Sequence, residues 1–281
     1  RMTAFSTPSS GRKASRKPLR GARPSRSAAA RPAMRLSITG VAESGAGIAE
    51  AVFKGRSVRV FVPGGLPGDE VEARLLPAKA GSQSLTARIE SIPVLSPERR
   101  AEPGCPMHEQ CGGCPLSPLR YPAQLELKQR MLAELFRAAP ELAPQLRPAL
   151  PATPSSEAPR NKAVLHFAGR PGALALGLYA QGTHRVAGAT LRCPRCPAWM
   201  EQAARALLEA ANRLGLEPWD EAEGRGLLRS VLMRGGRDGE RLLCLVTSAA
   251  PSEGVLEQLA AAVKAVPVTT AVLNVNAGRT N

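Results

Sequence analysis

Residues 48–62 read Ile48-Ala-Glu-Ala-Val-Phe53, then Lys54-Gly55 and Arg56, then Ser57-Val-Arg-Val-Phe-Val62. Short apolar runs lie on both sides of the Lys-Gly pair, which predicts two strands joined by a turn. Similar short apolar runs occupy residues 35–42, 70–76 and 85–92, with glycine- and proline-rich turns between them. Five strands at this spacing predict a small closed barrel over residues 34–95. Its expected form is the oligonucleotide-binding barrel, with a generic barrel as the alternative.

The rest of the chain changes character and indicates an α+β protein of several domains. Residues 96–121 form a cysteine-containing loop, and residues 122–159 combine a helix with a proline-rich linker. Residues 160–281 predict a mixed α/β domain. Its expected strands are residues 162–168, 173–180, 227–234, 241–247 and 270–275, and its expected helices are residues 198–214 and 252–266.

Composition excludes several classes of protein. No window approaches 18 consecutive apolar residues, so no membrane span or membrane partner is expected. Six cysteines in 281 residues are too few for a disulfide scaffold. Five Phe, two Tyr and two Trp argue against a sheet that stacks bases on several exposed rings.

The net charge of +15 favours a polyanionic partner, but it is unevenly distributed. Residues 1–42 hold ten basic residues and no acid, which leaves 28 − 23 = +5 for the remainder. Residues 1–33 are rich in Ser, Arg, Pro and Ala and are expected to be disordered. Three interpretations of this arm stay open: a contact to RNA phosphates, a targeting peptide, or a solvated tail without a specific role.

The chemistry of the sequence concentrates in Cys105-Pro-Met-His-Glu-Gln-Cys111-Gly-Gly-Cys114. Glycines in this loop would let the backbone approach a metal or sulfide and donate N–H groups to sulfur. Cys193 and Cys196 offer a fourth ligand, whereas Cys244 lies in an apolar strand and reads as a buried residue. Spacing alone fits an iron–sulfur cluster or a Cys₄ zinc site equally well, and disulfides fit poorly.

No phosphate-binding glycine loop, Ser/His/Asp set or pair of carboxylates stands out, so no catalytic residue is assigned. The residues by themselves predict a metal-bearing nucleic-acid-binding protein.

An ordered series of motifs resembles the bacterial RNA (uracil-5-)-methyltransferases over residues 36–281. The series begins with Leu66-Pro-Gly-Asp-Glu-Val71, Ser96-Pro-Glu-Arg99 and the cysteine loop. It continues through Tyr121-x-x-Gln124-Leu125-x-x-Lys128, Arg160-Asn-Lys162, Leu176-Gly-Leu-Tyr179, Gly182-Thr-His184, Leu228-Arg-Ser-Val231 and Asn274-x-Asn276-x-x-Arg279-Thr280.

The resemblance implies a TRAM barrel, a [4Fe–4S] cluster and an S-adenosylmethionine-dependent enzyme that methylates C5 of uracil in ribosomal or transfer RNA. The implied cluster ligands are Cys105, Cys111, Cys114 and Cys193, with Cys196 as the alternative to Cys193. The expected RNA contacts are Arg160, Lys162, His184 and Arg229.

In this family a Rossmann-like domain that binds the methyl donor follows the Asn-x-Asn motif. We therefore expect the chain to be the RNA-binding and iron–sulfur portion of such an enzyme, with the Rossmann-like domain absent. S-adenosylmethionine would then act only through a missing domain, and this portion would be inactive by itself. The alternative is a stand-alone iron–sulfur or zinc RNA-binding protein without methyltransferase activity. A monomer in the cytoplasm is expected, and the arm leaves organelle targeting open.

Overall fold

The computed structural model describes residues 33–53, 55–78, 81–102, 104–105, 107–108, 110–151, 160–187, 191–236 and 238–278. Except for Ala33, the predicted basic arm lies outside these residues, as does the second half of the predicted linker, residues 152–159. Among the described helices, none combines the length and apolar character needed to cross a membrane.

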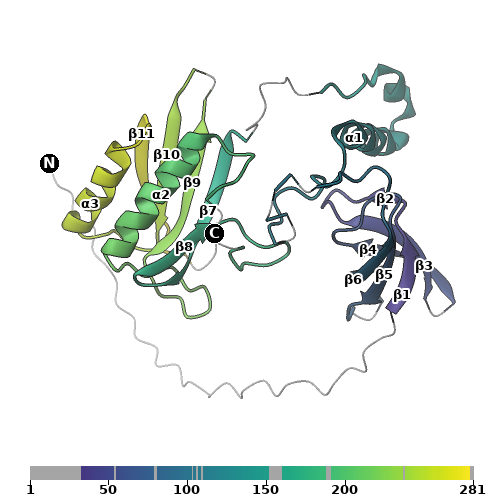
Figure 1. Ribbon diagram of the computed structural model, residues 1–281, viewed down its shortest axis with the longest axis horizontal. Helices are drawn as coiled ribbons and strands as arrows, with labels where there is room; N and C mark the ends of the chain where they lie inside the picture. Colours follow the sequence, from purple (N-terminus) through teal and green to yellow (C-terminus); the bar gives the residue numbers. More distant parts are fainter. Residues whose placement is uncertain are drawn as a thin grey trace, which may run out of the picture. The chain divides into compact units, whose positions relative to one another are not determined.

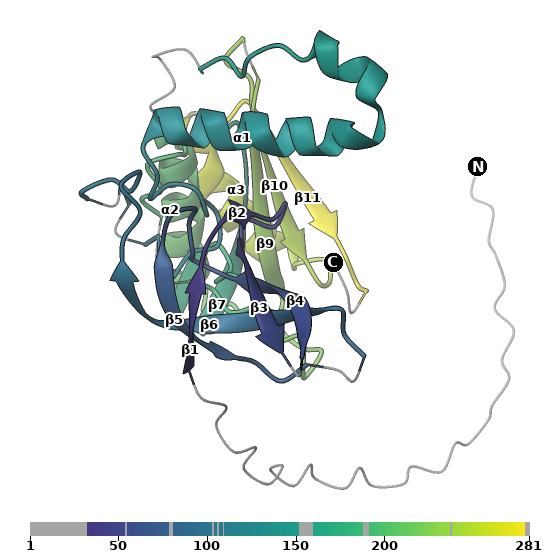
Figure 2. The same cartoon turned by 90° about the vertical axis from the view of Figure 1, so that its right-hand side faces the viewer.

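The first sheet has six strands in the order β1-β5-β6-β4-β3-β2. Their bounds are β1 Ala33–Ser37, β2 Gly40–Val41, β3 Gly47–Phe53, β4 Arg56–Val62, β5 Glu70–Leu75 and β6 Ser84–Val94. The two outermost strands of this order, β1 and β2, are separated in the chain by only two residues. The sheet must therefore curl back on itself, and Figure 2 shows its strands wrapped around a common interior. Alternate residues fill that interior, among them Leu36, Ala49, Val60, Val71 and Ala87.

The structure divides the single strand expected at residues 35–42 into β1 and β2. The backbone changes partner at this point, since Ile38 N–H donates to the carbonyl of Asp69 and Thr39 N–H donates to the carbonyl of Ile48. β1 thus pairs with β5, and β2 pairs with β3. The division is what lets one run of chain serve both edges of the curled sheet.

Helix α1, Tyr121–Leu135, follows the cysteine loop and leads into two short 3₁₀ turns, η1 Phe136–Ala138 and η2 Pro140–Gln145. Ala123 and Leu127 of α1 are buried against Leu66 and Leu119. Near the end of the helix, by contrast, Leu135 is 74% exposed. The first half of α1 therefore provides the packing.

The second sheet has five strands in the order β11-β10-β9-β7-β8. The strands are β7 Lys162–Arg170, β8 Ala173–Gly177, β9 Leu228–Gly235, β10 Arg241–Thr247 and β11 Thr270–Val275. Only the β10–β11 pair is parallel. Helices α2, Ala198–Arg213, and α3, Glu253–Lys264, lie against one face of this sheet (Figure 1).

The helix-covered face forms the larger core of the protein. Ala163, Leu165 and Phe167 of β7 join Leu207 of α2 and Leu259 of α3 in one apolar cluster. Because side chains alternate along a strand, Lys162, Val164 and His166 point to the opposite face. That open face and the loop that follows β8 position the residues described next.

Candidate functional site

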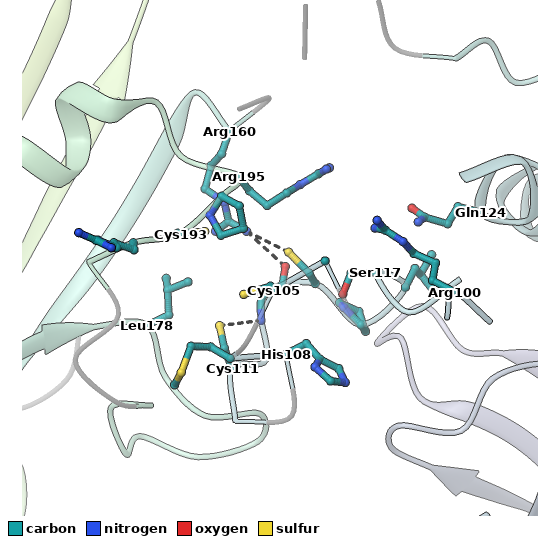
Figure 3. A pocket seen from close by; sticks show the side chains of 18 of the residues that line it. Arg100, Cys105, His108, Cys111, Ser117, Gln124, Arg160, Leu178, Cys193 and Arg195 are labelled. Atoms are coloured by element: carbon teal, nitrogen blue, oxygen red, sulfur yellow. Dashed lines mark hydrogen bonds between the residues drawn. The ribbon is translucent and has the colours of Figure 1, made fainter. Parts of the chain in front are cut away.

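Four cysteines from two distant segments line one cavity of about 630 Å³. Cys105, Cys111 and Cys114 come from the loop before α1, and Cys193 comes from the loop before α2. Figure 3 shows the side chains of Cys105, Cys111 and Cys193 around this hollow. The fold thus brings together thiols that lie far apart in the sequence.

The Gly-Gly pair shapes the cysteine loop in two ways. Gly113 N–H donates to Sγ of Cys111 at 3.4 Å. Gly112 N–H donates to the carbonyl of Tyr179 at 3.4 Å, so the loop lies directly on the segment after β8. A Cβ on Gly112 would stand 2.8 Å from Cα of Gln181, closer than such atoms approach in proteins. Glycine is therefore required by a backbone contact at this position.

Arg160 joins the two cysteine segments. Its backbone N–H donates to the carbonyl of Arg195 at 2.9 Å, and its Nη2 donates to the carbonyl of Gly113 at 3.3 Å. Nη2 also lies 3.9 Å from Sγ of Cys114. In Figure 3, Arg160 and Arg195 enter the cavity from one wall and Arg100 from another.

The cavity is strongly basic. Arg100, Lys128, Arg160, Arg192 and Arg195 line it, and its described lining contains no carboxylate. Such a wall stabilises an anionic group, including a set of thiolates. Arg192 and Arg195 flank Cys193 in the sequence, which is a signal that the sequence-based prediction missed. Arg100 and Lys128 carry no comparable signal, because only the fold brings them here.

Cys193 and Cys196 have different surroundings although they are three residues apart. A hydrogen bond from the Cys196 thiol outweighs the effect of burial and, with backbone N–H groups and Arg160, lowers the pKa of Cys193 to about 6. The same hydrogen bond and burial raise the pKa of Cys196. Cys196 packs against the core below α2, whereas Cys193 lines the cavity. Cys193 is thus the more acidic thiol of the pair.

The cysteines are not arranged around a single point. In the described part of the chain, no three His, Cys, Asp or Glu side chains converge closely enough to hold one metal ion. All six cysteines are free, and burial raises the pKa of Cys111 and of Cys244, which lies in β10 away from the cavity. Nδ1 of His108 is buried beside the cysteines and has no hydrogen-bond partner among the described residues.

The predicted RNA contacts occupy three kinds of position. Lys162 is exposed on the open face of the second sheet, and His184 is exposed in the loop after β8. Arg160 points into the cysteine cavity. Arg229 is only 5% exposed, and its Nη1 donates to the carbonyls of Asn276, at 2.8 Å, and Gly278. These two hydrogen bonds hold the segment after β11 in place. The guanidinium of Arg229 also lies over the ring of Trp219.

Comparison with known proteins relates the chain to RNA methyltransferases. No protein-family model matches it. An uncharacterized RNA methyltransferase of Halalkalibacterium halodurans is 31% identical over 252 residues, which are 88% of this chain and 52% of the relative. One from Gloeobacter violaceus is 34% identical over 78% of this chain and 47% of its own length. The chain spans about half the length of the curated relatives it matches.

A solved structure has a related fold at low sequence identity. The tRNA (uracil-54, C5)-methyltransferase of Pyrococcus abyssi, in complex with S-adenosyl-L-homocysteine, superposes with a TM-score of 0.55 at 21% identity. The match covers 79% of this chain and 48% of that protein. The described sheets are therefore part of a fold found in a methyltransferase.

Two predictions from the sequence are wrong in the light of these matches. One held that the chain lacks the Rossmann-like methyltransferase fold, and the other that it is an RNA-binding portion truncated before the catalytic domain. Relatives named RNA methyltransferases match 84–88% of the chain. The structure of a tRNA methyltransferase in complex with S-adenosyl-L-homocysteine matches 79% of it. Most of the chain therefore aligns with sequence and fold that occur within these methyltransferases, which overturns both predictions. The patterns of the single strands could not reveal this relationship, because they do not show to which larger fold the strands belong.

Proposed function

We propose that this chain, which is related to the RNA methyltransferases over most of its length, acts in S-adenosylmethionine-dependent methylation of C5 of uracil in RNA. The names of the relatives support methyl transfer to RNA, and the solved neighbour's title supports uracil C5 and the cofactor. Transfer RNA and ribosomal RNA are both candidate substrates in this proposal. A monomeric state and a cytoplasmic location remain predictions from the sequence.

The observation that carries the proposal within this chain is the cavity lined by Cys105, Cys111, Cys114 and Cys193. We propose that these four thiols hold a [4Fe–4S] cluster. A single zinc ion needs four sulfurs at about 2.3 Å from one point, whereas a four-iron cluster keeps its thiolates farther apart. Four thiols from two segments around one cavity of about 630 Å³ therefore support the cluster.

The electrostatics of the cavity fit the same group. A [4Fe–4S] cluster with four thiolates is an anion, and five cationic side chains line the hollow. The surroundings of Cys193 lower its pKa and so favour its thiolate, and N–H groups such as that of Gly113 stabilise sulfur ligands. Because Cys196 packs against the core, we propose Cys193 as the fourth ligand.

The role of such a cluster is structural in this proposal. It would tie the loop before α1 to the loop before α2, some 80 residues further along the chain, and cross-links that close long loops stabilise most. Arg160 already bridges the same two segments through Arg195 and Gly113.

The remaining residues would bind and orient the RNA. We propose that the curled first sheet is a TRAM-type barrel that follows the RNA backbone, and that Arg160, Lys162 and His184 contact RNA. Arg229 would act indirectly, by holding the segment at Asn276 and Gly278. S-adenosylmethionine supplies the methyl group when bound, and we assign no residue of the described chain to it. The alternative of an RNA-binding protein without methyl transfer is not retained, because the relatives are named methyltransferases.

Methyl transfer from labelled S-adenosylmethionine to separate pools of transfer and ribosomal RNA tests the proposal. Digestion of the RNA to nucleosides should yield labelled 5-methyluridine from one of the pools. Label in another nucleoside, or in neither pool, would refute uracil C5 as the target. Iron and sulfide should be measured on the same anaerobic preparation, since zinc without iron would refute the cluster.

A further inference from the structure

Three rings from three parts of the chain are stacked in one ladder. The rings of His166 and Tyr179 have centroids 3.7 Å apart and planes at 14° to each other. The ring of His184 continues the stack, 5.2 Å from Tyr179 and inclined by 9°. His166 is half-buried in β7, where burial and the neighbouring His184 lower its pKa. The side chain of His184 is 68% exposed, so the ladder runs from the sheet into solvent.

The exposed end of the ladder is held in position by the loop after β8. Ala187 N–H donates to the carbonyl of Leu178, and Ala180 N–H donates to the carbonyl of Arg185, each at 2.8 Å. These bonds place Tyr179 and His184 on the two arms of a tight turn. Nδ1 of His184 also lies 2.7 Å from Oε2 of Glu221, which fixes the orientation of the ring. One face of this ring meets Tyr179, and the side chain as a whole is 68% exposed to solvent.

The charge next to His184 identifies the kind of group that fits there. The carboxylate of Glu221 would repel a phosphate placed against the imidazole. It does not oppose a neutral, flat group stacked on the ring face. Rings of His and Tyr are among those on which unpaired bases of RNA stack. The chain has few aromatic residues, which argues against a platform of several separate exposed rings but not against a single ladder of this kind.

Cationic residues lie at a suitable distance on the same side of the sheet. Lys162 shares the open face of β7 with His166, four residues away, which corresponds to about 13 Å along a strand. Lys162 stands opposite the exposed Arg234 of β9. An RNA strand whose base stacks on the ladder would thus find cations for its phosphates on the face from which the ladder rises.

The ladder also adjoins the cysteine loop. The carbonyl of Tyr179 accepts the N–H of Gly112, and the preceding residue, Leu178, lines the cysteine cavity. Neighbouring residues of an extended segment point in opposite directions. One short segment therefore contributes Leu178 to the cysteine cavity and Tyr179 to the ring ladder.

We infer that the outer face of the His184 ring is a stacking platform for an unpaired base of the RNA substrate, supported from behind by Tyr179 and His166. The inference rests on the proposed function, because it takes the substrate to be RNA. It adds that a single-stranded base is recognised at a defined ring outside the cysteine cavity.

The test uses the full chain with its metal content and compares wild type, His184→Ala and His184→Phe. Binding is measured by the fluorescence anisotropy of a labelled single-stranded RNA and of its fully paired duplex, at low and at high salt. His184→Ala should weaken single-strand binding by roughly 5- to 150-fold, the range for loss of one stacked base, and leave duplex binding unchanged. His184→Phe should bind the single strand nearly as well as wild type. The ratio between wild type and His184→Ala should not change with salt, because stacking is not a charge interaction.

Each other result has a definite meaning. If wild type binds RNA and His184→Ala binds the single strand as tightly, the platform is refuted and the proposed function is untouched. If His184→Phe is as weak as His184→Ala and the loss shrinks at high salt, His184 acts through charge and the platform is again refuted. If wild type binds neither form of RNA, the proposed function fails and the platform falls with it. Iron per chain and the circular dichroism spectrum of each variant are the controls. Both should match wild type, because His184 is exposed and its replacement should leave the fold intact.

Discussion

The carboxylate of Asp69 is buried and is gripped on both oxygens by the guanidinium of Arg99. Arg99 Nη2 donates to Oδ2 at 2.6 Å, and Nε donates to Oδ1 at 2.9 Å. The backbone N–H groups of Leu66 and Ser96 donate to the same carboxylate at 2.7 and 2.9 Å. Asp69 ends the turn at residues 66–69 that precedes β5, and Arg99 follows β6. This pair therefore connects the segment after the last barrel strand to that turn. Asp69 lies in the motif Leu66–Val71 and Arg99 lies in the motif Ser96–Arg99, so this ion pair connects the two motifs.

Loss of this charge should destabilise the protein. Asp69→Asn keeps the size of the side chain but leaves Arg99, only 15% exposed, without its counter-ion. Breaking a buried pair in this way costs about 3 kcal/mol. The free energy of unfolding, from urea titration followed by circular dichroism, is the measurement. Glu90→Gln is the matched control, because the Arg74–Glu90 pair is on the surface of the same barrel and its loss should change little. Equal losses in the two variants would show that burial does not distinguish these pairs.

The same pair predicts how stability depends on pH. Burial raises the pKa of Asp69, but hydrogen bonds from Arg99, Ser96 and Leu66 outweigh it and hold the pKa below its ordinary value of 3.8. A carboxyl whose pKa is lower in the folded state stabilises the fold above the unfolded-state pKa and loses this contribution as pH falls through the folded-state pKa. The difference in free energy of unfolding between wild type and Asp69→Asn should thus be constant above about pH 5 and shrink below about pH 4. A difference that grows on acidification would contradict the assignment.

Local patterns were sufficient for the positions of most strands. The two apolar runs in residues 48–62 and the Lys-Gly pair between them locate β3 and β4 to within a residue, and the expected strands at 241–247 and 270–275 coincide with β10 and β11. The pattern could not predict the change of partner at Ile38, because that depends on Asp69 and Ile48 elsewhere in the chain. Nor could it reveal the half-exposed face of α1, since periodicity shows that a helix has an apolar side but not how much of that side is covered.

Replacement of single cysteines distinguishes the two candidates for the fourth ligand. Cys193→Ser should lose most of the iron, because the cavity loses one of the four thiols that line it. Cys196→Ser should retain most of it, because Cys196 packs against the core. Cys244→Ser, in β10, is the control and should keep the wild-type iron content. Iron and acid-labile sulfide per chain after anaerobic purification are the measurements. Retention of iron by Cys193→Ser together with its loss in Cys196→Ser would reverse the assignment.

A charge on the open face of the second sheet should contribute to RNA affinity in a salt-dependent way. Lys162→Ala should weaken binding to all RNA sequences alike and lower the slope of log affinity against log salt by about 1, the effect of one lost phosphate contact. Arg213→Ala removes an exposed charge at the end of α2, on the helix-covered side, and should leave the slope unchanged. Equal slopes for wild type and Lys162→Ala would remove this lysine from the RNA-binding surface.

The cysteine site was predictable in its residue types but not in its surroundings. The Cys-Gly-Gly-Cys spacing is local, and the expected N–H donation to sulfur matches the contact from Gly113 to Cys111. The choice between Cys193 and Cys196 depends on which of them faces the cavity, and that is decided by how α2 packs on the sheet. Arg229 lies in β9 between Leu228 and Ser230, and the carbonyls that it meets belong to a segment nearly 50 positions away in the chain.

The two neighbouring glycines of the loop give a matched pair of substitutions. A Cβ on Gly112 would lie 2.8 Å from Cα and 3.2 Å from N of Gln181, which are backbone atoms that cannot move without displacing the loop after β8. A Cβ on Gly113 would meet its nearest atoms, in side chains, at 3.4 Å, an ordinary contact. Gly112→Ala should therefore separate the cysteine loop from the segment that carries Leu178 and Tyr179, and both iron content and single-strand RNA affinity should fall. Gly113→Ala should reduce both much less, although it alters the same loop. If the two variants behave alike, the contact between Gly112 and Gln181 does not hold the loop in place, and the cysteine site and the ring ladder are not coupled through this segment.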